Sequence, residues 1–181
     1  ALRAIPNLFV FRPGDAVETA EAWQTALEAK RTPSVLALSR QGLTQFRSGD
    51  MRENKTAKGA YVAANCDGCR QITLIASGSE IGIAITAQTM LADAGISAAV
   101  ISVPCLDLFF MQDVSYRINV LGTTPRIVIE AGLRQCWDRL LGDGDVFIGM
   151  NGFGASAPID DLYNHFEITA DAVVAAAKDQ L

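Results

Sequence analysis

Short apolar runs alternate with helix-forming segments along most of this chain. Because strands that alternate with helices form parallel sheets covered by those helices, the alternation predicts an α/β fold with three layers and a largely parallel sheet. The predicted strands are residues 8–11, 34–39, 72–76, 98–103, 126–129 and 146–150. The predicted helices are residues 15–29, 79–94, 132–141, 158–165 and 169–178, with helical turns at 106–111 and 112–120.

The composition excludes several classes of protein and partner. Half of the 181 residues are hydrophobic and 19% are charged, which is typical of a folded chain and not of a disordered tail. The net charge is −5 and Lys and Arg form no cluster, so we expect neither a nucleic acid nor an anionic membrane as partner. No apolar run approaches the ~18 residues that a membrane-spanning helix requires.

The first fifty-five residues predict a β-α-β unit. Asp15 is expected to cap the helix at 15–29, with Glu18 completing a capping box. We assign Arg12 a structural role, pairing with Asp15 or Glu18. The helical spacing predicts that the core-facing residues are Ala16, Thr19, Ala20, Trp23, Ala26 and Leu27.

Arg40 is the residue with the sharpest functional hypothesis. The predicted strand 34–39 ends in Ser39-Arg40-Gln41, and open α/β sheets bind ligands at the carboxyl ends of their strands. A guanidinium at that edge can bind a phosphate or a carboxylate through two parallel N–H donors. The alternative is an ordinary loop arginine in a surface salt bridge, which contributes little to stability.

The remaining candidate residues favour structural roles. Cys66 and Cys69 have the spacing of half a zinc site or of a redox motif, but Asp67-Gly68 between them predicts a turn with incidental thiols. We expect Cys105 and Cys136 to be small core residues, and four thiols without a disulfide pattern fit a reducing cytoplasm.

Two further patterns also have structural explanations. The run from Ser77 to Gly82 follows a predicted strand, and we interpret it as a tight turn with a Ser79 helix cap because it completes no phosphate-binding motif. Ser156 and His165 do not suggest a nucleophile and its base, since no G-x-S-x-G motif surrounds the serine. His165 is expected to cap a helix end.

The polar stretch 41–58 has no sustained apolar period and predicts an exposed linker. The chain begins at Ala1 without an initiator Met, and the first predicted strand starts only a few residues later. We expect that processing, truncation or proteolysis removed an upstream segment.

Six segments, in order along the chain, resemble the transketolase family. They are Phe11–Glu18, Thr32–Gln41, Gly59–Val62, Ala76–Glu80, Ile129–Gly132 and Gly152–Pro158. The resemblance implies that residues 1–55 are the end of a pyrimidine-binding domain and its linker, and that residues 56–181 are the C-terminal domain. One departure is Asn151-Gly152 before Phe153, where many family members carry Asp-Arg.

The resemblance also implies a chemistry. Transketolases use thiamine diphosphate and Mg²⁺ to move a two-carbon ketol unit from a ketose phosphate to an aldose phosphate, in the pentose phosphate pathway and the Calvin cycle. In the family the arginine of the Ser-Arg-Gln segment contacts the sugar phosphate, which assigns that contact to Arg40. No other site residue carries over. We expect no catalytic, cofactor or metal ligand on this chain, no activity from it alone, and a homodimer of the full-length subunit.

Two other enzyme families and two non-catalytic roles remain open. The enzymes are 1-deoxyxylulose-5-phosphate synthase and the E1 β subunit of a 2-oxoacid dehydrogenase, which share the Arg-Pro-x-Asp-x-x-Glu region. The Ser-Arg-Gln ending favours transketolase over both. The other roles are a dimerisation or regulatory module, and one subunit of a split enzyme.

Overall fold

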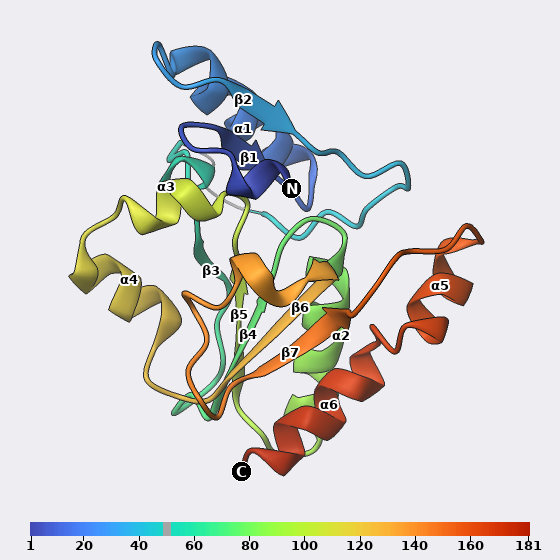
Figure 1. The fold of residues 1–181 in the computed structure, drawn as a ribbon. Coiled ribbons are helices and arrows are strands. Elements are labelled where there is room, and N and C mark those ends of the chain that lie inside the picture. Colours follow the sequence, from blue (N-terminus) through green and yellow to red (C-terminus); the bar gives the residue numbers. More distant parts are fainter. Residues whose placement is uncertain (49–51) are drawn as a thin grey trace.

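The computed structural model describes residues 1–48 and 52–181, which form two sheets (Figure 1). The smaller sheet pairs β1 (Phe9–Phe11) with β2 (Ser34–Leu36) in parallel, and α1 (Ala16–Glu28) connects them. This is the predicted β-α-β unit. The larger sheet has the order β3-β5-β4-β6-β7.

Four strands of the larger sheet run parallel: β4 (Ile72–Ala76), β5 (Ala98–Ser102), β6 (Arg126–Leu133) and β7 (Val146–Met150). The edge strand β3 (Tyr61–Ala64) pairs antiparallel with β5. An antiparallel strand at the edge of a parallel sheet is common in α/β folds. The predicted fold class is confirmed.

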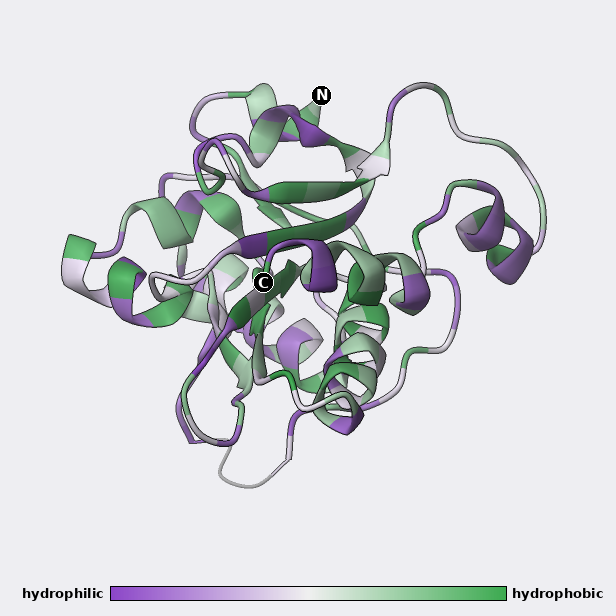
Figure 2. Ribbon diagram, turned by 90° about the horizontal axis from the view of Figure 1, so that it is seen from below, coloured by the Kyte–Doolittle hydropathy of each residue, from purple (hydrophilic) through white to green (hydrophobic). Residues whose placement is uncertain are grey.

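Helices cover both faces of the larger sheet and produce the three layers. On one face α2 (Glu80–Asp93) and α6 (Ala170–Asp179) pack against the strands through buried residues such as Ala84, Leu91 and Val173. On the other face lie α3 (Leu106–Phe110), α4 (Val114–Leu121) and the fully buried Trp137. Figure 2 shows the most hydrophobic residues concentrated on the strands between these layers.

The remaining elements are short. They are α5 (Ile159–His165) and three 3₁₀ helices, η1 (Leu2–Ala4), η2 (Thr56–Lys58) and η3 (Arg134–Cys136). None of the helices in the described part of the chain is long and apolar enough to cross a bilayer.

Two predicted elements are wrong in extent or type, and one strand was missed. The strand predicted at 34–39 ends at Leu36, and β3 was not predicted because it adjoins a polar stretch and pairs on one side only. Residues 132–141 are not an α-helix. Instead, β6 continues to Leu133 through a bulge opposite β7, and η3 then turns Trp137 into the core.

The face that α1 buries is not the apolar one. Trp23 and Leu27 are 52% and 71% exposed, whereas Glu18, Glu21 and Ala22 are buried. The two carboxylates tolerate burial because hydrogen bonds and an arginine satisfy them, as the site geometry below shows. The predicted core face of this helix is therefore wrong.

The helix ends follow the sequence signals in part. Asp15 Oδ1 accepts a hydrogen bond from the Glu18 backbone N–H at 2.8 Å, as a helix cap should. The Glu18 carboxylate accepts from the N–H of Gly14 and not from that of Asp15, so the capping box is displaced by one residue. After α2, Gly95 adopts φ +78°, the left-handed conformation that ends helices.

The carboxyl ends of the two sheets face each other. Arg12 follows β1, and its backbone N–H donates to the carbonyl of Pro104, two residues beyond β5. The backbone N–H of Gly78, two residues beyond β4, donates to the Arg12 carbonyl. The side chains that follow these strands therefore meet between the two sheets, at the end of the larger sheet where Figure 1 shows the β1-β2 unit.

Candidate functional site

Arg40 lies beyond the carboxyl end of β2, on an exposed bend. The chain leaves β2 with one further sheet-like bond, from the Ala37 N–H to the Phe11 carbonyl at 2.8 Å. Within residues 1–48 and 52–181, the Arg40 guanidinium has no hydrogen bond or ion pair. All its N–H donors are thus available to an anionic ligand, and its role as a phosphate anchor stays a prediction.

The segment after Arg40 is fixed to α1 by buried polar contacts. Gln45 Nε2 and the Arg47 N–H both donate to Asp15 Oδ2, at 2.8 and 2.9 Å. The Arg47 guanidinium makes two bonds to the Glu21 carboxylate, each 2.9 Å. The prediction of an exposed linker at 41–58 is wrong at Arg47, which is 6% exposed. Residues 49–51 of the predicted linker lie outside the described residues.

These contacts shift the pKa values of the pair. Burial alone would raise the pKa of Glu21, but hydrogen bonds from Arg47 and from the Thr56 N–H lower it below its usual range. Burial by itself would lower the pKa of Arg47. The hydrogen bonds to Glu21 and its negative charge outweigh burial, so the pKa of Arg47 is raised. Both groups therefore stay charged at neutral pH.

The lowered pKa of Glu21 predicts a specific acid dependence of stability. A carboxyl with a depressed pKa contributes stability above its unfolded pKa of about 4.5 and loses it as the pH falls through the folded pKa. We expect Glu21→Gln to cost about 1.5–3 kcal/mol near pH 7 and to remove this part of the decline in acid. The check is the urea midpoint of both proteins from pH 7 to 3. The exposed Glu28→Gln on the same helix is the control, and an equal effect there would contradict the assignment.

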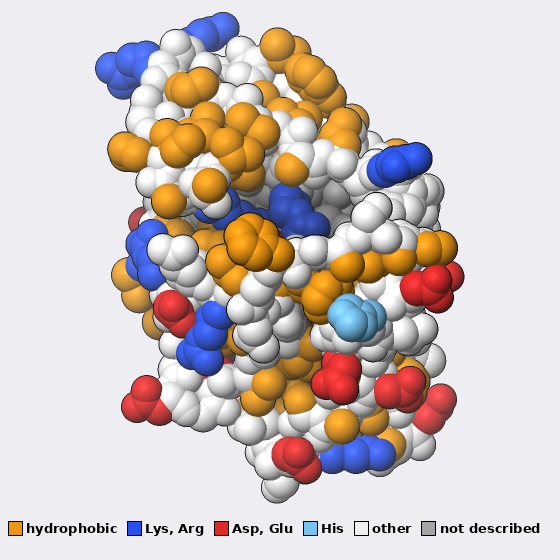
Figure 3. Space-filling model, turned by 45° about the vertical axis from the view of Figure 1, so that its right-hand side comes forward, with side chains coloured by type: hydrophobic (Ala, Val, Ile, Leu, Met, Phe, Trp, Pro, Cys, Tyr) orange, Lys and Arg blue, Asp and Glu red, His pale blue; other side chains and the backbone are white. Residues whose placement is uncertain are grey.

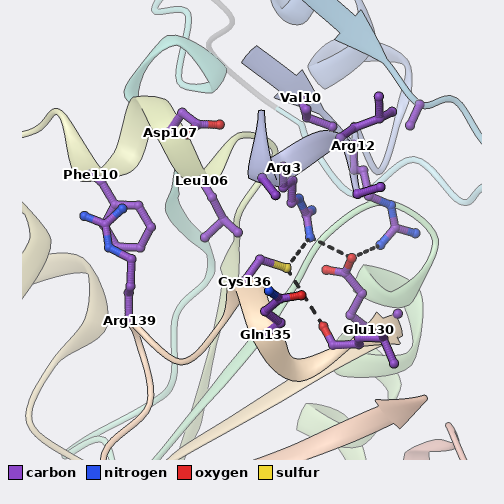
Figure 4. Close-up of a pocket in the computed structure, with 16 residues that line it drawn as sticks. Arg3, Val10, Arg12, Leu106, Asp107, Phe110, Glu130, Gln135, Cys136 and Arg139 are labelled. Carbon is purple, nitrogen blue, oxygen red and sulfur yellow. Dashed lines mark hydrogen bonds and ion pairs between the residues drawn. The ribbon is translucent and has the colours of Figure 1, made fainter. Parts of the chain in front are cut away.

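A second set of polar side chains joins the two sheets through Arg12. Its guanidinium contacts Glu80 Oε2 at 2.9 Å and Glu130 Oε1 at 3.0 Å. Arg3 contacts the same Glu130 oxygen at 2.7 Å, and Figure 4 shows both guanidinium groups directed at that carboxylate. The prediction that Arg12 pairs with Asp15 or Glu18 is wrong, because its partners come from the facing sheet.

These four residues, Arg3, Arg12, Glu80 and Glu130, form what we call the interdomain ion cluster. Glu80 is buried and also accepts hydrogen bonds from Tyr163 and Ser79, both at 2.8 Å. Burial would lower the pKa of Arg12, but Glu80 and Glu130 raise it above its ordinary value. A buried ion pair of this kind is costly to break from one side only.

Glu18 is buried between the sheets, where neutral groups donate hydrogen bonds to it. Its carboxylate accepts hydrogen bonds from Tyr61 and Gly14 at 2.6 Å and from Ser102 at 2.5 Å. Burial raises the pKa of Glu18 in spite of these bonds. Glu18 therefore ties α1 to β3 and β5, which supports the structural role that the sequence assigned to it.

Beside the interdomain ion cluster lies a cavity of about 500 Å³. Its walls come from η1, the end of β1, α3 and η3, and Figure 3 shows Lys or Arg side chains within a hollow of this molecule. Arg139 lies over the Phe110 ring, 3.5 Å from its centroid. Cys136 is half-buried against the core and also lines the cavity, where it accepts a bond from Arg3 Nη1 at 3.4 Å, so the prediction of a core residue is only partly confirmed.

Several sequence interpretations are confirmed. Gly78 adopts φ +57° in a tight turn, where the Ser77 hydroxyl bonds to Arg12 and Glu130 at 3.2 Å each. Cys105 is buried, which raises its pKa to about 11. Two predicted caps are wrong: Ser79 stands at the N-cap of α2, but its hydroxyl donates to Glu80 Oε1 and caps no backbone N–H, and the C-cap residue of α5 is Phe166, with His165 the last residue of the helix. All four cysteines are free thiols.

Sequence reasoning missed most of the interdomain ion cluster. Arg3, Glu80 and Glu130 carried no assigned role, although the two glutamates lie near the ends of the adjacent parallel strands β4 and β6. That position was a usable signal, since polar residues at neighbouring carboxyl ends meet at one edge of a sheet. Arg47 gave no such signal, because it lies in a polar stretch.

The described residues offer no metal site. Across residues 1–48 and 52–181, no three or more His, Cys, Asp or Glu side chains are grouped so that they could hold a metal ion.

Comparison with known proteins gives a consistent family. Residues 59–169 match the family model of the transketolase-like C-terminal domain, and residues 1–45 match that of the transketolase pyrimidine-binding domain. A transketolase of Cereibacter sphaeroides is 55% identical over 181 residues, which cover 100% of this chain and 27% of the relative. A transketolase of Sinorhizobium medicae is 56% identical over 99% of this chain and 26% of its own length.

The structures agree with the sequences. A transketolase from Leishmania mexicana superposes with a TM-score of 0.90 at 37% identity, covering 99% of this chain and 26% of that one. These matches do not favour the synthase or dehydrogenase alternatives. The chain spans about a quarter of the length of the relatives it matches. The chain belongs to the transketolase family.

Proposed function

We propose that the complete protein to which this chain contributes is a transketolase, transferring a two-carbon ketol unit from a ketose phosphate to an aldose phosphate. The observation that carries the proposal is Arg40, an exposed and unpaired guanidinium beyond the carboxyl end of a parallel strand, in a unit that matches the pyrimidine-binding domain. No other described residue is assigned to substrate.

In this proposal Arg40 binds the phosphate of the sugar. Paired N–H donors suit two phosphate oxygens, and a charge-assisted contact of this kind contributes about 1.5–3 kcal/mol. Because the phosphate is remote from the carbons that react, its binding serves mainly to position the sugar. The contacts of Gln45 and Arg47 with α1 support this role by anchoring the segment that follows Arg40.

Family membership implies thiamine diphosphate and a divalent metal, and the cofactor supplies the carbanion chemistry that protein side chains lack. We assign the cofactor ligands to parts of the protein outside this chain. The domain boundary at 55/56, the homodimer and the cytoplasmic location remain part of the same proposal.

An activity comparison tests the proposal. The complete protein, with thiamine diphosphate and Mg²⁺, is expected to form a ketose phosphate from xylulose 5-phosphate and ribose 5-phosphate. Residues 1–181 alone are expected to form none under the same conditions. A complete protein that binds the cofactor but transfers no ketol unit would contradict the function. Turnover by residues 1–181 alone would contradict the placement of the cofactor ligands.

A further inference from the structure

Cys66 and Cys69 lie in the connection between β3 and β4, residues 65–71. Both strands pair with β5, on its opposite sides, so the connection passes the beginning of β5. Ser97, the residue before β5, holds the connection there. Its Oγ donates to the Asp67 carbonyl at 2.8 Å, and its carbonyl accepts from the Gln71 N–H at 2.8 Å.

The connection is longer than the distance that it spans. Two strands that flank a third are about 10 Å apart, whereas seven extended residues reach about 23 Å. The excess chain must fold back on itself, and it does so between the two cysteines, bending at residues 67–69 with Gly68 at φ +74°. The surplus length and a glycine in the left-handed region thus both favour a reversal at this position.

Such a reversal suits a disulfide between its two ends. The first and fourth Cα atoms of a tight four-residue reversal lie within about 7 Å. A disulfide requires Cα atoms about 4.4–6.8 Å apart. Cys66 directly precedes the bending residues 67–69 and Cys69 is the last of them, so the two cysteines are the first and fourth residues of a segment with Asp67 and Gly68 at its centre.

The two thiols also differ in accessibility. Cys69 is exposed, whereas Cys66 is half-buried and lines a surface cavity of about 410 Å³. Cys105 is fully buried, and Cys136 lies near Arg3 on a different part of the molecule. The pair therefore has one thiol positioned to meet a small disulfide in solution and a second positioned to react with the first.

We propose that Cys66 and Cys69 form a reversible intramolecular disulfide by exchange with a small disulfide such as oxidised glutathione. The Cys69 thiolate attacks one sulfur of glutathione disulfide, forming a mixed disulfide and releasing one glutathione thiolate. The Cys66 thiolate then attacks the Cys69 sulfur and releases the second. Two cysteine S–H groups lose their protons and two electrons pass to glutathione, which leaves as two thiols.

The test is mass analysis of the complete protein after incubation with oxidised glutathione. We expect the peptide that contains residues 66–69 to lose two hydrogens without retaining glutathione, and reduced glutathione to reverse the change. In Cys66→Ser the second step is blocked, so a stable glutathione adduct on Cys69 is expected. Cys136→Ser is the control, and it should form the 66–69 disulfide as the original protein does.

Two results would overturn the proposal. A glutathione adduct that persists on Cys69 of the unaltered protein would show that the two sulfurs do not meet. An unmodified 66–69 peptide, under conditions that oxidise an unstructured peptide of the same sequence, would show that the fold holds the thiols apart or hidden. Because neither cysteine takes part in the proposed ketol transfer, the outcome is independent of that function.

Discussion

Replacing Arg40 by alanine in the complete protein is expected to raise the KM for a phosphorylated acceptor by about 10- to 150-fold. That range corresponds to the loss of about 1.5–3 kcal/mol from a charge-assisted contact. The guanidinium is exposed and has no partner within residues 1–48 and 52–181, so its removal should break no contact that holds the fold. The measurement is the KM for ribose 5-phosphate beside that for glycolaldehyde, which has no phosphate.

The glycolaldehyde comparison separates phosphate binding from other effects. If Arg40 binds phosphate, the KM for glycolaldehyde barely changes, and the urea midpoint stays within the range of a surface substitution. Arg31→Ala is the matched control, since Arg31 is another exposed arginine of the same unit and should leave both constants unchanged. Equal increases for the two acceptors would remove Arg40 from the phosphate site.

The second large effect is expected at the interdomain ion cluster. Arg12→Ala should destabilise the contact between the two sheets by about 3–5 kcal/mol, because it leaves the buried Glu80 carboxylate without its cation. Glu130 still has its ion pair with Arg3 in this variant, so the loss of stability comes mainly from the unpaired Glu80. The measurement is the thermal and urea midpoint of the complete protein.

Two further variants test that explanation. Arg12→Ala combined with Glu80→Gln should recover part of the loss, because the double variant no longer buries an unpaired charge. Arg134→Ala removes an ion pair with Asp138, four residues further along the chain. Both side chains are about half exposed, so the loss should cost no more than about 1 kcal/mol. An Arg12 effect as small as that of Arg134 would show that the interdomain ion cluster does not hold the sheets together.

The sequence determined the order of the elements and the class of fold. Strands such as β4 and β5 are buried on both faces, so their side chains form uninterrupted apolar runs that are visible without a structure. The Asp15 cap depends on neighbouring residues alone, and it appeared where the sequence placed it. Arg40 was identified because it directly follows an apolar run.

Only the tertiary structure decided which face of α1 is buried and which residues pair across the sheets. The apolar face of α1 is exposed because Glu18 and Glu21 find hydrogen-bond partners on β3, on β5 and at Arg47, which lie 26 to 84 residues away along the chain. Arg12 meets Glu130 for the same reason, since the carboxyl ends of two sheets face each other. Local sequence patterns report apolar burial and helix ends, whereas the partner of a buried charge depends on how distant segments pack.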